Sequence, residues 1–303
     1  FQSPIKLTML PEMEDMYLPE EGVAHNIAII KINKTYPGQA YKVANALWGA
    51  GQMMFNKIII VVDGDIDIRN HLELAKKVAK NFNPDSDIHF GKGPLDVLDH
   101  ASEKPGIGGK LLIDATEKLP EEKADNGAYQ DLIDSETLAE MISAEVKTIE
   151  GFSTHLVGLG LPIILLSIDK RKEPDVKTVA TKTLKILGSN IPKILIAVDK
   201  EVPLNDISTV TWYLSGNIDA ARDCSLIKND AEEASCLFID GTRKSFTTDN
   251  FPRNWPNIVT SSPETISSVD KKWETLKLGK LLQSPSSRFQ WERFIEGAIL
   301  KDV

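Results

Sequence analysis

The stretch Lys57-Ile58-Ile59-Ile60-Val61-Val62-Asp63 returns later in the chain as Lys193-Ile194-Leu195-Ile196-Ala197-Val198-Asp199. Each copy holds five apolar residues in a row, mostly β-branched, and closes on an aspartate. Such a run is typical of a buried strand in a sheet that carries helices on both faces. The chain is therefore predicted to contain the same unit twice.

The repeat extends to both sides of this strand. Ile27–Ile32 precedes the first copy and Ile163–Ile168 precedes the second, at an offset of 136 residues that still holds at Asp87. Leu111–Lys118 then returns as Leu237–Lys244 at an offset of 126 residues. Ten residues are therefore missing from the second copy.

The order of the elements predicts an α/β fold. Segments with helical spacing follow the strands, and strand, helix, strand, helix is the signature of a parallel sheet with right-handed crossovers. We expect two repeated three-layer (α/β/α) units with mainly parallel sheets, plus C-terminal helices. The predicted boundaries are a lead-in connector at 1–21, the first unit at 22–120, a linker with a helix at 121–158, a degenerate second copy at 159–260 and C-terminal helices at 261–303.

Two amphipathic helices are expected after the second unit. The first carries Ile266, Val269, Trp273 and Leu276 on one inward face, and the second covers Phe289–Leu300. Helices outside the repeats need a surface to cover, such as a partner subunit.

A glycine-rich loop distinguishes the two copies. Gly91–Lys110 holds this loop in the first copy, and most of it is missing from the second. A duplicated unit that keeps its core strands but loses such a loop has kept what folding needs and dropped what a binding site needs. The first copy is therefore the better candidate for function.

Composition narrows the classes of partner. A formal charge of −9 and a pI near 5.2 argue against nucleic acid, because affinity for a phosphate backbone comes from clustered lysine and arginine. No apolar run approaches the roughly 18 residues of a membrane span. Cys224 and Cys236 are the only cysteines, which favours reduced thiols and a cytoplasmic setting, with a disulfide between them left open.

One segment resembles the start of a calcium loop. Asp63, Asp65 and Asp67 have the right spacing, but the sixth position is Ile68 and the twelfth is Leu74 instead of glycine and glutamate. Carboxylates that cap a helix after a strand are the simpler interpretation. No metal site is predicted.

The glycine-rich loop also contains a polar cluster. Asp96, Asp99 and His100 could combine a histidine and a carboxylate as a general base. No nucleophile accompanies them, so a structural role is favoured. The other histidines show no metal-binding spacing, and no catalytic residue is assigned in this chain.

Lys57 is the candidate for a cofactor contact. It stands at the mouth of a buried strand, where its ammonium can reach an anion while its aliphatic stem packs. Lys193 repeats it in the second copy, where no site is expected. A structural lysine is therefore an equally good interpretation.

Longer segments of the first unit carry a family resemblance: Pro11–Asn26, Tyr36–Ala40, Lys57–Asp67, Gly93–Ser102 and Ile113–Thr116. They resemble the C-terminal domain of the UbiD family of decarboxylases, and the resemblance covers the chain from its start to about residue 118. The second unit is similar to a degenerate copy of that domain, and its residues 240–244 and 253–256 resemble the family's tail.

The resemblance implies an activity and its cofactors. UbiD enzymes hold prenylated FMN through Mn²⁺ and K⁺ in an N-terminal flavin-binding domain, and remove CO₂ from aromatic or α,β-unsaturated acids. By this resemblance the catalytic and metal-binding residues lie ahead of Phe1, and Lys57 contacts the flavin phosphate. The chain would complete the active-site cleft and supply oligomer contacts, with its own flavin domain and further copies of itself as partners. Alone, it is expected neither to bind flavin tightly nor to be active.

Two functions remain open at this point. The chain is either the C-terminal part of a prenylated-FMN-dependent (de)carboxylase or a free-standing assembly or small-anion-binding module that never had a flavin domain. A preceding flavin domain of about 280 residues, roughly two ordinary domains, separates the two hypotheses.

Overall fold

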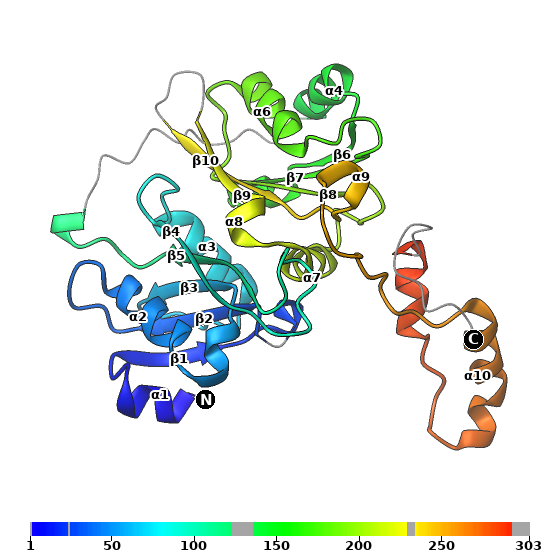
Figure 1. Cartoon of the computed structure of the whole chain (residues 1–303), viewed down its shortest axis with the longest axis horizontal. Coiled ribbons are helices and arrows are strands. Elements are labelled where there is room, and N and C mark those ends of the chain that lie inside the picture. The colour runs from blue at the N-terminus through cyan, green and yellow to red at the C-terminus, as the bar shows by residue number, and fades with distance from the viewer. Residues whose placement is uncertain (1, 24, 123–135, 229–233, 293–303) are drawn as a thin grey trace.

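The computed structural model describes residues 2–23, 25–122, 136–228 and 234–292. Within these ranges the chain forms two α/β units, coloured blue to cyan and green to yellow in Figure 1, followed by a C-terminal extension. Each unit is built on one five-stranded sheet with parallel strands in its middle. The predicted fold class, an α/β fold in two repeated units, is therefore confirmed.

The first sheet has the strand order β1-β2-β3-β5-β4, and its two edge strands are antiparallel to their neighbours. Its strands are β1 (Met13–Tyr17), β2 (Ile27–Ile32), β3 (Ile58–Asp63), β4 (Ile88–Pro94) and β5 (Ile107–Asp114). Its helices are α1 (Gln2–Thr8), η1 (Glu20–Gly22), α2 (Gln39–Trp48), η2 (Gly51–Phe55), α3 (His71–Asn81) and η3 (Pro120–Glu122).

The second sheet repeats this order as β6-β7-β8-β10-β9. Its strands are β6 (Ile149–Ser153), β7 (Ile163–Ile168), β8 (Ile194–Asp199), β9 (Cys224–Lys228) and β10 (Ser235–Asp240). Its helices are α4 (Glu136–Glu145), α5 (His155–Gly158), α6 (Val176–Leu187), α7 (Ile207–Asn217), α8 (Ala220–Asp223) and α9 (Phe246–Asp249). The C-terminal extension holds α10 (Pro263–Leu276) and η4 (Pro285–Glu292).

Helices cover both faces of the first sheet. Val43 and Leu47 of α2 pack with Val61 on one face, whereas Leu74 of α3 packs with Val62 on the other. Neighbouring residues of a strand point to opposite faces, so each uninterrupted apolar run fills two cores. In the second unit α6 and α7 pack in the same way.

The predicted pairing of the repeated strands is confirmed. β7 and β8 are parallel neighbours, and β2 and β3 pair in the corresponding register. Lys57 and Lys193 each stand one residue ahead of their strand, as predicted.

Two segments predicted as connectors form edge strands instead. β1 falls within 1–21 and pairs antiparallel with β2, and β6 falls within 121–158 and pairs antiparallel with β7. In each strand one residue is buried, Met13 or Ile149. A strand with a single buried residue shows no apolar run, which is why the sequence did not reveal it.

Much of the segment predicted as a glycine-rich loop is a β-hairpin. Gly91–Pro94 ends β4 and Ile107–Lys110 begins β5, so the loop itself covers residues 95–106. The glycines of β5 admit the second unit at close range: a Cβ on Gly109 would overlap the backbone nitrogen of Ala221 in α8. Here glycine serves the packing of one unit on the other.

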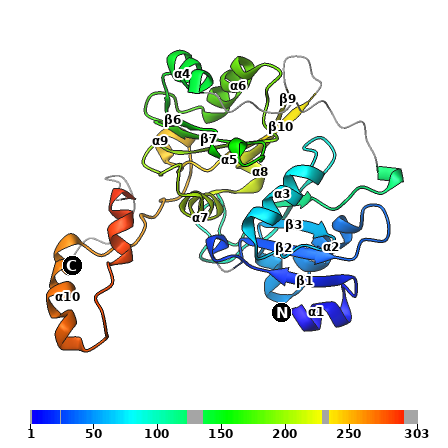
Figure 2. The same cartoon turned by 180° about the vertical axis from the view of Figure 1, so that it is seen from behind.

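The C-terminal extension stands apart from both sheets in Figures 1 and 2. α10 has no buried residue, so the face predicted to point inward is not covered within the described chain. An apolar face predicts a covering surface, but that surface need not belong to the same chain. η4 touches α7, where the ring centroids of Phe289 and Trp212 are 5.3 Å apart. Most of the predicted last helix, Phe289–Leu300, lies outside the described residues.

The two units meet as a symmetric pair. Lys57 donates a hydrogen bond of 3.0 Å to the carbonyl of Ile218, which caps α7. Lys193 donates one of 2.7 Å to the carbonyl of Phe82, which caps α3. Lys193 corresponds to Lys57, and Ile218 to Phe82, at the offset of 136 residues. The lysine of each unit therefore binds the helix end of the other unit. Carbonyls at a helix C-terminus favour a cation, and apolar residues from both units form one core around them.

No described helix combines the length and hydrophobicity that crossing a membrane requires. Cys224 and Cys236 are buried free thiols, and burial raises the pKa of both. A buried thiol with a raised pKa is a poor nucleophile.

Candidate functional site

The loop of residues 95–106 lies against α7 and the tail of the second unit. Between them opens a cavity of about 360 Å³, which we call the interunit pocket. It is lined by Val23, His25, Asn26, Asp96, Leu98, Asp99, His100, Trp212, Tyr213, Gly216, Asn217 and Ile258. The second copy has lost the matching loop, so the pocket belongs to one side of the symmetric pair.

Lys57 lies beneath this loop with 0% of its surface exposed. Its Nζ is 2.8 Å from Oδ2 of Asp99 and 3.0 Å from the carbonyl oxygen of Ile218. Asp99 also accepts the N–H groups of Ala101 and Ser102, which closes the turn of the loop. Through these two contacts Lys57 links the loop of the first unit to the end of α7 in the second.

This geometry bears on the predicted flavin contact. The ammonium of Lys57 is enclosed by protein oxygens, and Lys193 is likewise engaged by the carbonyls of Ala79 and Phe82. These contacts favour the structural interpretation that the sequence left open. A contact between Lys57 and a flavin phosphate stays a prediction for the longer protein.

His100 forms the inner wall of the pocket. Its Nε2 lies 3.1 Å from Oδ1 of Asn217, and its ring stands edge-on to Trp255 with centroids 4.8 Å apart. Burial lowers the pKa of His100, so the ring is neutral at pH 7 and donates its Nε2 proton to the amide oxygen. The predicted cluster of Asp96, Asp99 and His100 thus lines one pocket, and each member has a structural partner there.

A contact between a histidine and a carboxylate lies at the mouth of the pocket. Nε2 of His25 is 3.6 Å from Oδ2 of Asp96, and both side chains are 28% exposed. Oδ1 of Asp96 accepts the N–H of Leu98, so the same carboxylate also orients the tip of the loop. Sequence reasoning left His25 among the scattered histidines, because no local pattern links it to Asp96.

The tail of the second unit clamps the loop from outside. Arg253 donates hydrogen bonds to the carbonyls of Ser102 at 2.8 Å and Asp99 at 3.3 Å. Arg222 of α8 donates one of 2.7 Å to the carbonyl of Ala101. Neither arginine was predicted as a site residue; Arg253 lies in a segment noted only for its resemblance to the family's tail.

Lys110 is a second buried lysine, at the base of the hairpin. Its Nζ donates to the carbonyls of Met54, Asn56 and Pro94 at 2.6, 2.7 and 2.6 Å. Burial and the nearby ammonium of Lys57 lower the pKa of Lys110 to about 7. Sequence reasoning gave this lysine no role, because backbone carbonyls leave no trace in a sequence.

The described residues of the pocket offer anchoring and packing. They bring no nucleophile together with a base. No group of three histidine, cysteine or acidic side chains in the described ranges could hold a metal ion. In the calcium-like segment Asp63 pairs with Lys77 at 2.9 Å, and Asp67 accepts the N–H of Arg69. These carboxylates brace the strand end and the turn that follows.

Comparison with protein families gives a match over both units. Residues 2–115 and 129–235 match the 3-octaprenyl-4-hydroxybenzoate carboxy-lyase C-terminal domain, UbiD_C. The two ranges correspond to the two copies of the repeat.

The curated relatives are longer than this chain. The chain is 31% identical over 270 residues to an uncharacterized protein of Helicobacter pylori strain J99, which covers 89% of this chain and 41% of the relative. It is 47% identical over 113 residues to an uncharacterized protein of Aquifex aeolicus, which covers 37% of this chain and 23% of the relative. The chain thus spans about two fifths, at most, of the length of these curated relatives.

Solved structures of enzymes also match part of the chain. One is vanillic acid decarboxylase of Sedimentibacter hydroxybenzoicus, with 28% identity, a TM-score of 0.37, and coverage of 47% of this chain and 30% of that chain. Another is the UbiD-class enzyme HmfF of Pelotomaculum thermopropionicum in complex with FMN, with 24% identity, a TM-score of 0.35, and coverage of 46% and 30%.

Proposed function

Since the chain belongs to the family of UbiD C-terminal domains, we propose that it is the C-terminal part of a prenylated-FMN-dependent (de)carboxylase that acts on aromatic or α,β-unsaturated carboxylic acids. The family match over both units carries this proposal. The relatives are more than twice as long as the matched part, which leaves room for a flavin domain in the longer protein.

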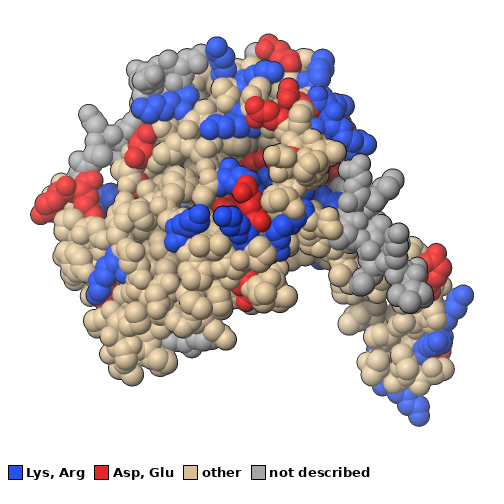
Figure 3. Space-filling view, viewed as in Figure 1, with Lys and Arg blue, Asp and Glu red and all other residues tan. Residues whose placement is uncertain are grey.

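In this proposal the first unit completes the active-site cleft. The loop of residues 95–106 exposes two apolar side chains at its tip, Val97 at 78% and Leu98 at 86%. Figure 3 shows that charged side chains gather over the second unit, whereas the surface over the first unit in this view is largely uncharged. An apolar, weakly charged surface suits burial against another domain.

The cofactor is proposed to bind outside this chain. Prenylated FMN supplies the electron sink for decarboxylation, with Mn²⁺ and K⁺ as its metals. In the described ranges the buried cations Lys57 and Lys110 are enclosed by protein oxygens, and no metal-binding group of side chains is formed. In this proposal the chain contributes a wall of the cleft.

The C-terminal extension is proposed to serve contacts between copies of the enzyme. α10 carries Val269 and Leu276 exposed on its apolar face, without a covering surface in the described chain. A second copy of the protein would bury this face. We also assign the enzyme to the cytoplasm, which two buried reduced thiols favour.

The test is to express the longer protein with a source of prenylated FMN and to measure CO₂ release from cinnamate-like and hydroxybenzoate-like acids. The 303-residue chain alone is the control. We expect bound flavin and turnover in the longer protein and neither in the control, because the chain lacks an electron sink. A longer protein without flavin, or CO₂ release by the chain alone, contradicts the proposal.

A further inference from the structure

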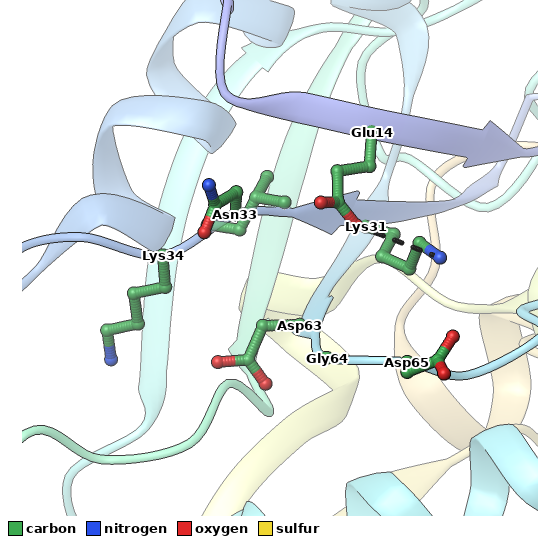
Figure 4. A pocket seen from close by; sticks show the side chains of 8 residues that line it. Glu14, Lys31, Asn33, Lys34, Asp63, Gly64 and Asp65 are labelled. Atoms are coloured by element: carbon green, nitrogen blue, oxygen red, sulfur yellow. Dashed lines mark ion pairs between the residues drawn. The ribbon is translucent and has the colours of Figure 1, made fainter.

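The first unit holds a polar crevice that shares no lining residue with the interunit pocket. It lies outside the carboxyl ends of β2 and β3 (Figure 4), with a volume of about 290 Å³. It is lined by Glu14, Lys31, Ile32, Asn33, Lys34, Asp63, Gly64 and Asp65. The chain leaves β2 for α2 on one face of the sheet and β3 for α3 on the other. Ligands of α/β sheets bind where successive connections diverge in this way.

An irregular edge strand shapes one side of the crevice. β1 shifts register between Met13 and Asp15, which takes Glu14 out of the ladder. In Figure 4 the Glu14 side chain points from β1 toward Lys31, and their charged groups are 3.7 Å apart. Nζ of Lys31 also donates to the carbonyl of Ile66 at 3.3 Å. An ammonium has three donors, so Lys31 keeps capacity for a further acceptor.

The turn after β3 forms the other side. Gly64 has a φ of +80°, and the N–H groups of Gly64 and Asp65 have no hydrogen-bond partner among the described residues. Successive N–H groups beside a left-handed residue form a concavity that binds anions. The carboxylate of Asp65 is exposed at the same place. The crevice thus presents hydrogen-bond donors, the N–H groups of Gly64 and Asp65, beside a hydrogen-bond acceptor, the carboxylate of Asp65.

The corresponding place in the second unit is filled. Lys200 stands at the position of Gly64, and its Nζ is 3.0 Å from Oδ2 of Asp169, which stands at the position of Asn33. The N–H of Lys200 donates to a carbonyl of β7, a bond that Gly64 does not make. The Arg171 guanidinium and the Lys200 ammonium hold the pKa of Asp169 well below its usual range. The second copy therefore holds an ion pair at the place where the first copy holds the crevice.

We propose that the open crevice binds a small zwitterion with one carboxylate and one ammonium group, the chemistry of a free α-amino acid. The ligand's carboxylate meets Lys31 and the free N–H groups of Gly64 and Asp65. Its ammonium meets the carboxylates of Glu14 and Asp65. A volume of about 290 Å³ gives room for a ligand of this size.

The charges of the crevice select this class over simpler ions. A ligand with a negative charge alone is repelled by the carboxylates of Glu14 and Asp65, and a ligand with a positive charge alone is repelled by the ammonium of Lys31. The other two charged lining groups pair with residues outside the lining: Lys34 with Glu122 and Asp63 with Lys77. They add no net charge to the site.

Nuclear magnetic resonance of the ¹⁵N-labelled full chain tests this proposal. Glycine, L-alanine and L-glutamine are titrated as zwitterions, and acetate and methylamine as probes with a single charge. We expect saturable shifts of the Gly64 and Asp65 amide signals with at least one zwitterion. Acetate and methylamine should bind at least about tenfold more weakly, because each satisfies half of the site.

Variants that exchange the two copies provide the controls. Gly64→Lys combined with Asn33→Asp copies the filled site and should abolish the shifts, while the milder Lys31→Met should weaken binding at least about tenfold. Lys200→Gly in the second unit should leave binding at Gly64 unchanged. The proposal is wrong if no zwitterion gives saturable shifts, if acetate or methylamine binds as tightly, or if the double variant still binds.

Discussion

The two units share one skeleton, and they differ where ligands or partners could approach. At the end of β3, Asp63 accepts the N–H of Glu117, and at the end of β8 Asp199 accepts that of Arg243. Such contacts hold the strand ends together, and duplication kept them in both copies. Among the described residues, the loop of residues 95–106 belongs to the first copy, and the second copy holds the Lys200–Asp169 ion pair at the place of the crevice. The comparison separates side chains that the fold needs from those that a site needs.

Even the shared contacts changed their chemistry between the copies. The second partner of Asp63 is the ammonium of Lys77, whereas that of Asp199 is the hydroxyl of Tyr213 at 2.7 Å. Burial raises the pKa of Asp199 to about 6, and the hydrogen bond from Tyr213 offsets part of that effect. The fold requires an acceptor at this position, and it tolerates a change of donor.

The largest difference in stability between the copies is expected when Lys57 and Lys193 are replaced. Lys57→Met leaves the carboxylate of Asp99 buried without its cation, so we expect a loss of about 3–5 kcal/mol in the free energy of unfolding. Lys193 donates to the carbonyls of Ala79 and Phe82, so Lys193→Met should cost about 1–3 kcal/mol. Urea denaturation of the two variants measures both values.

A double variant checks the cause. Lys57→Met with Asp99→Asn removes both charges and keeps an oxygen acceptor for the N–H groups of Ala101 and Ser102, so it should recover at least half of the loss. Equal losses for Lys57→Met and Lys193→Met, or no recovery in the double variant, would show that the ion pair is not what distinguishes the copies.

The packing of the hairpin against α8 gives the next largest effect. In Gly109→Ala the new methyl group would overlap Ala221 and lie 2.5 Å from Oδ1 of Asp219, so we expect a loss of about 1–3 kcal/mol from overpacking. Its counterpart, Ser235, already carries a Cβ and donates a hydrogen bond to Asp85. Ser235→Ala should cost about 1 kcal/mol. Thermal unfolding that ranks Ser235→Ala as the more harmful change would refute this view of the interface.

The lowered pKa of Lys110, a residue of the first unit, predicts that the free energy of unfolding depends on pH. Its pKa is lowered from 10.5 to about 7 by burial, so between these values the unfolded chain binds more protons than the folded one. The free energy of unfolding should therefore rise with pH above 7, by at most about 1.4 kcal/mol per pH unit. Lys110→Met should remove this rise, and Lys80→Met at the surface should keep it. An unchanged pH profile in Lys110→Met would mean that the carbonyl cage keeps the ammonium charged.

The smallest effect on the chain itself is expected in α10. Val269 is exposed there, so Val269→Asp should change the free energy of unfolding by no more than about 0.5 kcal/mol. In the longer protein the same change should shift sedimentation toward smaller assemblies, because it places a charge on the proposed contact face. Unchanged assembly would exclude α10 as that contact.

The sequence revealed those parts of the fold that combine repetition with burial. β2, β3, β7 and β8 are uninterrupted apolar runs, so their existence and pairing were predictable. The edge strands β1 and β6 were not, because a half-exposed strand with one buried residue has no distinctive pattern. The hairpin strands were hidden by their glycines, whose role depends on the position of α8.

The candidate site could be predicted only in part. Asp96, Asp99 and His100 are close in sequence and were grouped correctly in one loop. Their partners Asn217 and Arg253 come from the other unit, and no pattern along the chain connects them. The burial of Lys57 likewise follows from the packing of one unit on the other, which a strand's own sequence does not encode.

The most direct test is whether the first unit, and not the second, faces the flavin domain. Leu98→Asp and Phe246→Asp each place a charge on an exposed apolar residue, at 86% and 73% exposure, one in each unit, so neither should unfold the chain. Flavin occupancy and kcat/KM for CO₂ release are measured for both variants of the longer protein. We expect Leu98→Asp to lower kcat/KM at least about tenfold, or about 1.4 kcal/mol, and Phe246→Asp to leave it within about twofold. Equal effects, or a loss confined to Phe246→Asp, would contradict the assignment of function to the first unit.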